Sequence, residues 1–325
     1  MKRFWSAAII VAVFAVLFTA TACNSRESGK IQIGYILMSR TTEFLVGEEY
    51  GALDEAKKYP DIELIMIDGE SSNEKQVAAT EDLITRGAKA IVLNPYNSDG
   101  ISAAVIKANA QGIPLVDVDS FANGGTIDVH VGFDNAEAGR LAAAYLGELL
   151  GGRGKILEIR GPLGLIHADR RYQGFHEIMD ARYPNIQIIT MEAQEWASDR
   201  GREITMDALT ANPDLAAIYS HSDNMMIGAV PALEQSGRLF PIGDPRHIPV
   251  ASIDAAPFGV SAVANGYIDV TFSQDPIWMG REAVKAAVAL AKGEKPAAVA
   301  ESDPIRVTRE NANDPGLWAI QFAQK

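Results

Sequence analysis

Short apolar stretches alternate with longer amphipathic stretches from Ile31 onward. Short apolar runs predict β-strands, and apolar residues at helical spacing predict helices. The sequence predicts strands at 31–37, 62–67, 90–94, 113–119, 129–133, 155–160, 186–190, 215–220, 248–254, 267–274 and 303–308. It predicts helices at 43–58, 73–86, 98–110, 138–149, 166–182, 199–211, 223–236 and 284–291, and a helix-sized segment between the strands 248–254 and 267–274. This alternation is typical of parallel sheets covered by helices, which is the α/β class.

The strand–helix units form two consecutive sets, followed by a leftover helix and strand. The chain has 325 residues, which is long for one ordinary domain. We therefore expect two similar lobes between which the chain passes near Gly132, Gln274 and Pro304. The predicted lobes are residues 31–131 with 275–302, and residues 132–274 with 303–325.

The N-terminus predicts export from the cytoplasm. Lys2 and Arg3 precede an apolar run at 4–18, which is typical of a signal peptide, here over residues 1–22. Residues 20–23, with the sequence ATAC, resemble a bacterial lipobox, in which the cysteine, here Cys23, is lipid-modified. The same residues also fit the A-x-A rule for simple secretion. We expect a lipoprotein of the cell envelope, in which residues 23–30 form a flexible tether.

Composition and charge narrow the class of partner. The chain is 47% apolar and 22% charged, as soluble globular proteins are, and its formal net charge is −13. Removal of residues 1–22 takes away two basic residues and no acid, so the exported chain carries −15. This strongly acidic balance argues against nucleic acid as a partner. Cys23 is the only cysteine, so an intramolecular disulfide is excluded.

The sequence offers little for catalysis. It has no G-x-S-x-G motif, and its five histidines fall at no metal-ligand spacing. The segment GGRGK at 151–155 lacks the order of a phosphate loop and is interpreted as a helix stop and turn. We therefore expect no enzyme, no cofactor and no metal.

Polar or aromatic residues recur just past the ends of the predicted strands. In parallel sheets the carboxyl ends of the strands border the ligand-binding crevice. The candidates are Ser39, Phe44, Asp119, Arg171, Trp196, Asp223, Asp254 and Gln274. Carboxylates, a guanidinium and amides match the donors and acceptors of sugar hydroxyls, and aromatic rings can stack on a sugar ring.

Several candidates also have a purely structural interpretation. Asp223 begins a predicted helix and could be its N-cap. Arg171 lies beside Arg170, and one of two adjacent arginines on a helix ordinarily points to solvent. Trp196 could cover an edge of the core, and Phe44 could simply pack within the protein.

The residues also carry a family resemblance from Ile31 to about Thr308. The segments that match are AIVLNPYNSDG (90–100), IPLVDVDS (113–120), DNAEAGRLAAAYL (134–146), RYQGF (171–175), YSHSDNMMIGA (219–229), VASIDAAP (250–257) and TFSQDP (271–276). Together, and in this order, they resemble the periplasmic sugar-binding proteins of the ribose/galactose type, the receptors of ABC importers with the fold of the LacI-type repressor core. The resemblance implies two Rossmann-like lobes with parallel sheets, joined by a three-strand hinge, which close on a sugar.

The resemblance also implies roles for individual residues. Asp119, Arg171, Asp254 and Gln274 match polar sugar contacts, Trp196 matches an aromatic stacker, and Ser222 with Asp223 match a further polar pair. The chain departs from the family pattern at Ser120, where an arginine is frequent, at Ser222, where asparagine is typical, and in the loop 39–44, which argues against ribose itself.

The expected function is therefore capture of a monosaccharide or related polyol and its delivery to a membrane permease. We expect a monomer, attached to the membrane only through the lipid on Cys23. The alternative is a receptor that reports the sugar to a chemotaxis protein or a sensor kinase. A repressor is less favoured because an export signal stands where a DNA-binding segment would be needed.

Overall fold

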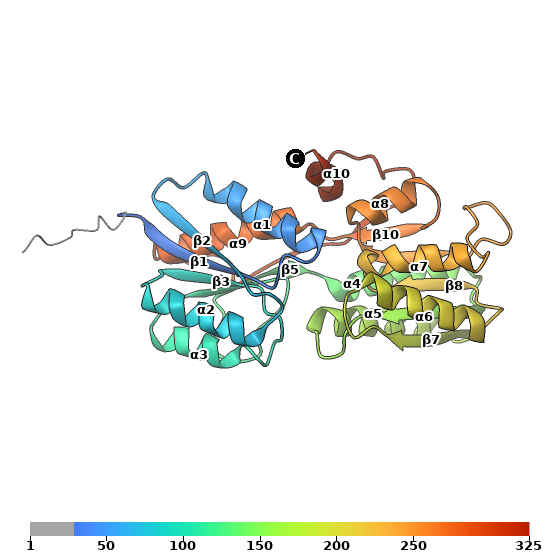
Figure 1. Cartoon of the computed structure of the whole chain (residues 1–325), viewed down its shortest axis with the longest axis horizontal. Coiled ribbons are helices and arrows are strands. Elements are labelled where there is room, and N and C mark those ends of the chain that lie inside the picture. The colour runs from blue at the N-terminus through green and yellow to red at the C-terminus, as the bar shows by residue number, and fades with distance from the viewer. Residues whose placement is uncertain (1–28, 325) are drawn as a thin grey trace, which may run out of the picture. The chain divides into compact units, whose positions relative to one another are not determined.

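The computed structural model describes residues 29–324, and this part of the chain forms two six-stranded sheets with helices on their faces (Figure 1). The predicted signal peptide and Cys23 lie outside the described residues, and so does most of the predicted tether. Within residues 29–324, none of the helices has the length and apolar character needed to cross a membrane.

The first sheet has the strand order β11-β5-β4-β3-β1-β2, and all its neighbouring strands are parallel. Its strands are β1 (Ile31–Leu37), β2 (Ile62–Asp68), β3 (Ala90–Leu93), β4 (Leu115–Val118), β5 (Val129–Phe133) and β11 (Val299–Ser302). Its helices are α1 (Glu43–Ala56), α2 (Asn73–Thr85), α3 (Ser102–Ala110) and α9 (Pro276–Ala291). Helices α1 and α9 cover one face of the sheet, and α2 and α3 cover the other (Figure 1). We call this unit the first lobe.

The second sheet has the order β12-β10-β9-β8-β6-β7 and is parallel except for the pair β10–β12. Its strands are β6 (Gly154–Arg160), β7 (Ile186–Glu192), β8 (Ala217–Ser220), β9 (Val250–Asp254), β10 (Val270–Ser273) and β12 (Ile305–Val307). Its helices are α4 (Asn135–Leu149), α5 (Ile166–Arg182), α6 (Ser198–Ala211), α7 (Asp223–Gln235), α8 (Pro257–Ala264) and α10 (Trp318–Ala323). We call this unit the second lobe. The prediction of an α/β fold with two parallel sheets is confirmed.

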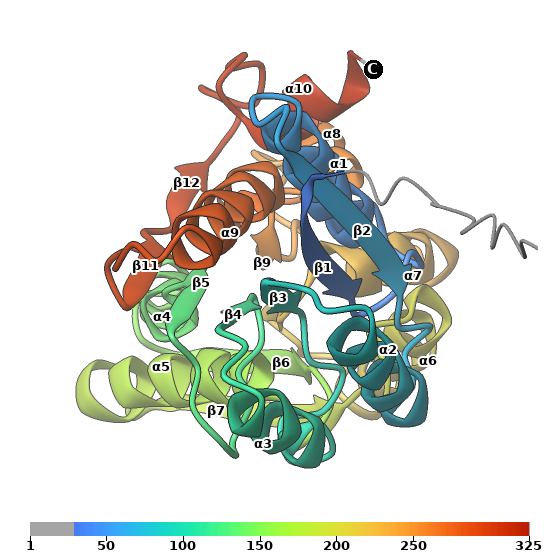
Figure 2. The same ribbon diagram turned by 90° about the vertical axis from the view of Figure 1, so that its left-hand side faces the viewer.

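The chain passes between the two sheets three times. It leaves the first sheet after Phe133, returns after Ser273, and crosses again between β11 and β12. In Figure 2 these two short strands lie one after the other beside α9. The first crossing follows two residues beyond the expected lobe boundary, because Gly132 and Phe133 still pair with β11.

Alternate residues of the central strands face opposite apolar clusters, as the pleat of a strand requires. Tyr35 packs with α1 and α9 in one buried cluster, whereas Ile36 packs with α2 and α3 in another. In the second lobe, Tyr219 faces α4 and α5, and Ile218 faces α6 and α7. Strands that are apolar on both sides therefore lie buried between helix layers in both lobes.

Three helix pairs pack closely through reciprocal glycines. In the pair α1–α9, a Cβ atom at Gly51 would overlap the carbonyl oxygen of Ile277, and one at Gly280 would overlap that of Glu48. The pairs α4–α5 and α6–α7 repeat this arrangement with glycines 139 and 174, and 201 and 228. The glycines thus allow a closer backbone approach than any larger side chain would permit.

A few elements differ from the prediction. The helix expected to begin at Ser98 begins at Ser102, because the Asn97 side chain accepts hydrogen bonds from the backbone of Asp99 and Gly100 and forms a turn there. Strand β11 and helix α10 were not expected. Two of the four residues of β11 are exposed, so this strand shows no apolar run.

Candidate functional site

A cavity of about 880 Å³ lies at the carboxyl ends of both sheets. Its wall is formed by residues of both lobes, and a volume of this size is typical of small-molecule sites. All the residues within 29–324 that the sequence singled out line it, namely Ser39, Phe44, Asp119, Arg171, Trp196, Ser222, Asp223, Asp254 and Gln274. The structure thus brings together residues that are as far apart in the sequence as Ser39 and Gln274.

The backbone at two strand ends adopts conformations that are rare for residues with a side chain. Asp119 follows β4 directly and has φ 61°, and Asp254 ends β9 with φ 114°. Positive φ values are uncommon outside glycine, although Asp and Asn adopt them more readily than other residues, and they cluster at functional sites. Here they occur at the two acids that end strands of opposite lobes at the cavity.

The Asp254 carboxylate is the centre of a hydrogen-bond network. Its Oδ1 accepts from Nε2 of Gln274 at 2.6 Å, and Nη1 of Arg171 lies 3.4 Å from the same oxygen. Its Oδ2 accepts from the Ser222 hydroxyl at 2.6 Å. Burial raises the pKa of Asp254, and the nearby Arg171 charge opposes that shift. The network therefore places one acid, one amide and one guanidinium at a single point of the cavity.

Arg171 is buried although it lies on a helix beside a second arginine. Its Nε donates to Oδ1 of Asn135 at 2.7 Å, and its Nη1 also donates to the carbonyl oxygen of His221. Its guanidinium carbon lies 5.7 Å from the centre of the Trp196 ring. Arg171 is therefore the member of the pair that faces inward.

Asp223 is held by groups of its own lobe. Its Oδ1 accepts from the Thr271 hydroxyl at 3.0 Å, and its Oδ2 accepts from the backbone N–H of Ala256 at 2.9 Å. Burial and the neighbouring Asp254 raise its pKa to about 7. The N-cap interpretation of Asp223 is wrong, because Ser222 caps α7 and accepts from the N–H of Asn224 at 3.1 Å.

The Asp119 carboxyl is buried without an ion-pair partner among residues 29–324. Burial raises the pKa of its carboxyl to about 6, the Arg171 charge and the Asn94 amide act to lower it, and Asp254 acts to raise it. Among the described residues, no lysine, arginine or histidine forms an ion pair with Asp119, although its residue surface is only 7% exposed. Asp223 likewise has no ion-pair partner in the described part of the chain, but two protein donors hold its carboxylate, Thr271 and the N–H of Ala256.

The cavity also contains a residue that the sequence interpretation missed. His167 lines the wall, stacks on Trp196 with ring centres 5.2 Å apart, and its Nδ1 lies 3.2 Å from the Ser120 hydroxyl of the first lobe. Burial and the Arg171 charge lower the pKa of His167 to about 3, so the imidazole is neutral. The sequence could have indicated His167, because it lies four residues before Arg171 and therefore on the same face of α5.

Behind the cavity wall lies a second missed group. Glu48 of α1 accepts from the Tyr35 hydroxyl at 2.9 Å and from the Asn94 amide at 2.7 Å. Burial, and next the charge of Asp119, raise the pKa of Glu48 to about 8. Within residues 29–324, no group of three or more His, Cys, Asp or Glu side chains could hold a metal ion.

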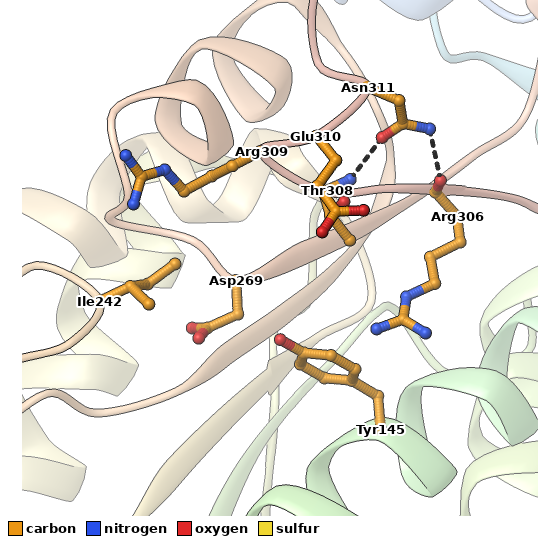
Figure 3. Close-up of a pocket in the computed structure, with 8 residues that line it drawn as sticks. All are labelled: Tyr145, Ile242, Asp269, Arg306, Thr308, Arg309, Glu310 and Asn311. Carbon is orange, nitrogen blue, oxygen red and sulfur yellow. Dashed lines mark hydrogen bonds between the residues drawn. The ribbon is translucent and has the colours of Figure 1, made fainter.

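A separate cavity of about 550 Å³ lies in the second lobe (Figure 3). The Tyr145 hydroxyl points toward the Asp269 carboxylate there (Figure 3). Oδ2 of Asp269 already accepts from Nε2 of His247 at 2.9 Å and from the N–H of Val250 at 2.8 Å. None of the residues that line this cavity was a sequence candidate.

Comparison with known proteins gives consistent matches over most of the chain. Residues 33–295 match a sequence model described as a periplasmic binding protein domain. The ribose import binding protein of Bacillus subtilis (strain 168) is 30% identical over 299 residues, which cover 89% of this chain and 94% of that protein. The ribose import binding protein of Escherichia coli (strain K12) is 30% identical over 283 residues, which cover 87% of this chain and 92% of that protein.

Solved structures agree with these matches. An ABC transporter solute binding protein from Bacillus halodurans C-125 with bound myo-inositol has a TM-score of 0.82 and 29% identity, and the match covers 89% of this chain and 98% of that one. The periplasmic binding protein of the arabinose ABC transporter from Shewanella sp. ANA-3, bound to α- and β-L-arabinofuranose, has a TM-score of 0.80 and 27% identity. That match covers 90% of this chain and 95% of the other.

Proposed function

The chain belongs to the periplasmic binding protein family, and on that premise we propose that it is the solute-binding component of an ABC importer that captures a monosaccharide or related polyol. The members with which it was matched are binding proteins rather than enzymes. One observation carries the proposal: every candidate residue chosen from the sequence within 29–324 lines one cavity between the carboxyl ends of two sheets.

The chemistry of the lining supports a ligand rich in hydroxyl groups. Asp119 and Asp254 offer acceptors, Arg171 offers donors, and the Gln274 amide offers both. Trp196 and Phe44 offer ring faces for the apolar side of a sugar ring. We assign ligand contacts to these side chains and to the hydroxyl groups of Ser39 and Ser222.

Asp223 has a different role in this proposal. Because its carboxylate is bound by Thr271 and by the N–H of Ala256, it fixes the start of α7 against β10 and the end of β9. This attachment positions Ser222 and Asp254, which face the ligand. Asp223 is therefore a positioning residue for the site.

Closure of the two lobes is the proposed mechanism of capture. The first lobe comprises residues 31–133 with 275–302, and the second comprises residues 134–274 with 303–325, so the first boundary falls two residues later than the sequence suggested. A ligand that contacts both lobes stabilises the closed form and shifts the population toward it. The closed form is then the state that a membrane permease recognises, with the binding protein acting as a monomer.

Attachment to the membrane is a separate part of the proposal. Members of the family are found in the periplasm or cell envelope, and residues 1–22 with Cys23 have the pattern of a lipoprotein signal. Metabolic labelling with a radioactive fatty acid should label the wild-type protein and not the Cys23→Ser variant. Equal labelling of both proteins would exclude lipid attachment at Cys23.

Thermal unfolding tests the sugar site directly. Pentoses, hexoses and polyols are added singly, and a ligand that binds the folded state raises Tm. The double variant Arg171→Ala and Asp254→Ala should lose this increase. The matched control is Arg246→Ala with Asp244→Ala, which removes the same two residue types from an exposed ion pair of 2.7 Å. A full response of the site variant would show that the site is elsewhere.

A further inference from the structure

Acidic residues outnumber basic residues at the large cavity. Within residues 29–324, seven acidic residues line it, namely Glu43, Glu70, Asp119, Glu195, Asp199, Asp223 and Asp254. Among the described residues, Arg171 is the only lysine or arginine in that lining. His167, the other basic side chain, is neutral because burial and the Arg171 charge lower its pKa. The cavity therefore has an excess of negative charge.

The single guanidinium is already engaged with protein groups. Arg171 lies beside Asp254 and donates to Asn135 and to the carbonyl oxygen of His221. Its neighbour Arg170 forms an ion pair with Glu301 at 3.6 Å, and its guanidinium carbon lies 4.7 Å from the centre of the Phe121 ring. Arg170 does not contribute to the cavity wall.

The residue after Asp119 brings no positive charge. Ser120 stands there, and its hydroxyl lies 3.2 Å from Nδ1 of His167. Asp119 consequently has no ion-pair partner among the described residues, although it is almost fully buried. An unpaired buried charge is costly, and a ligand that supplies the opposite charge recovers that cost.

A second acceptor at the same cavity is also unused. Gln274 is 3% exposed, and its Nε2 donates to Asp254, whereas its Oε1 is buried and has no hydrogen-bond partner in the described part of the chain. Buried polar atoms are normally paired, so this oxygen is suited to a ligand donor. Asp119 and Gln274 thus both offer acceptors to whatever occupies the cavity.

We propose that the cavity selects a polyhydroxylated ligand that carries an ammonium group, such as an amino sugar or an amino-cyclitol, over the corresponding neutral or anionic compound. Asp119 binds the ammonium group, which has three donors and no acceptor. A charged donor gives a stronger hydrogen bond to a carboxylate than a hydroxyl does. The inference rests on the proposed function, because it concerns the ligand of the same site.

A bound metal ion is a poorer explanation of the negative charge. The described residues contain no group of three or more His, Cys, Asp or Glu side chains that could hold a metal. Two of the buried acids at the cavity are engaged by protein donors, Asp254 by Ser222 and Gln274, and Asp223 by Thr271. An ammonium group on a polyol carries a single charge, which one carboxylate can neutralise, and Asp119 is the carboxylate left for it.

Isothermal titration calorimetry with matched compounds tests the proposal. D-glucosamine, D-glucose, N-acetyl-D-glucosamine and D-glucuronate form one series, the galactose counterparts form a second, and myo-inositol with its amino-deoxy counterpart forms a third. In the series that fits the cavity, the amine should bind at least about tenfold more tightly than the neutral compound, and the acid should bind least. The acetylated amine controls for size without charge.

The Asp119→Asn variant identifies the carboxylate responsible. Asparagine tolerates positive φ, so the backbone at this position is retained. The ratio of amine affinity to neutral-sugar affinity should fall toward one in this variant, whereas Asp244→Asn, at a remote exposed site, should leave the ratio at its wild-type value.

The outcomes separate this inference from the proposed function. If neutral compounds bind as tightly as the amines, or the acids bind best, the amine preference is overturned and sugar binding stands. If no compound of the three series binds but a pentose or another polyol raises Tm, the amine preference fails and sugar binding stands. If none of these compounds binds, the proposed function fails as well. An amine preference that survives in Asp119→Asn would overturn the role of that residue.

Discussion

Nε2 of Gln274 lies 2.6 Å from Oδ1 of Asp254 and donates a hydrogen bond to it. Asp254 ends a strand of the second lobe, whereas Gln274 lies where the chain leaves that sheet and enters α9 of the first lobe. The bond therefore connects the candidate ligand site to one of the three crossings. If ligand binding moves Asp254, this hydrogen bond pulls on the chain where it crosses between the lobes. Movement of the lobes in turn displaces Asp254.

The Gln274→Ala variant tests this connection. It removes the donor to Asp254 and the unpaired acceptor Oε1, so we expect ligand affinity to fall by about 10- to 100-fold, as for loss of one or two hydrogen bonds to charged or buried groups. Calorimetry with the best ligand measures the change. Gln235→Ala is the control, because the Gln235 side chain accepts a hydrogen bond from Arg202 at the surface, away from the cavity lining. Equal affinities for the two variants would show that Gln274 has no part in binding.

The contact between Ser120 and His167 joins the two lobes at the edge of the cavity. Ser120→Ala removes this hydrogen bond and leaves the His167 ring stacked on Trp196. Because one neutral hydrogen bond contributes about 1 kcal/mol, the ligand affinity should fall by about fivefold. Small-angle scattering of the ligand-bound protein should show a larger fraction of the open form. Unchanged affinity and scattering would mean that the contact does not favour closure.

Because ligands bind at the carboxyl ends of parallel strands, the sequence predicted which residues would come together at the cavity. It did not predict the contacts that each of them makes. Asp119, Asp254 and Gln274 each follow or end a strand, and sheet geometry alone brings such residues to one edge. Their role in ligand binding stays a prediction. His167 and Asn135 were missed because they reach the site from helices, and their contacts depend on how α4 and α5 pack.

The fold was predictable where burial leaves a pattern in the sequence. Apolar runs located the central strands of both sheets because those strands are buried on both faces. Strand β11 lies at a sheet edge with alternate residues exposed, so it has no such run. Glu48 was overlooked because helix periodicity does not reveal that a glutamate faces a tyrosine and an asparagine inside the lobe.

Close packing of α1 on α9 should make Gly280 intolerant of substitution. A Cβ atom in Gly280→Ala would overlap the carbonyl oxygen of Glu48, so the helices must separate and neighbouring contacts are lost. We expect the free energy of unfolding to fall by about 1–3 kcal/mol, measured by urea denaturation. Lys285→Ala, on the exposed face of the same helix, is the control. A loss no larger than that of the control would show that the helices adjust without cost.

The buried Glu48 carboxyl should make the stability of the protein depend on pH. Its pKa is about 8 in the folded protein and near its usual value of 4.5 in the unfolded chain. Between these values the folded state keeps a proton that the unfolded state has lost, so the free energy of unfolding should fall as pH rises from about 4.5 to about 8. Glu48→Gln should remove the share of this decrease that Glu48 contributes, which shows most clearly between about pH 7 and about pH 8, because the raised pKa values of Asp119 and Asp223 contribute only below that range. Urea denaturation at several pH values measures it.

Asp119 provides the comparison that isolates Glu48. Its pKa rises from 3.8 to about 6, so its own contribution to the fall in stability should be complete near pH 6. The Asp119→Asn variant should therefore lose the decrease at the acidic end and keep a decrease toward pH 8, made smaller because the Asp119 charge is one cause of the raised pKa of Glu48. The slope of the Glu48→Gln profile should differ from that of wild type most clearly above about pH 7, beyond the pKa of about 7 that Asp223 has. Identical profiles for wild type and Glu48→Gln would mean that Glu48 ionises as freely in the folded protein as in the unfolded chain.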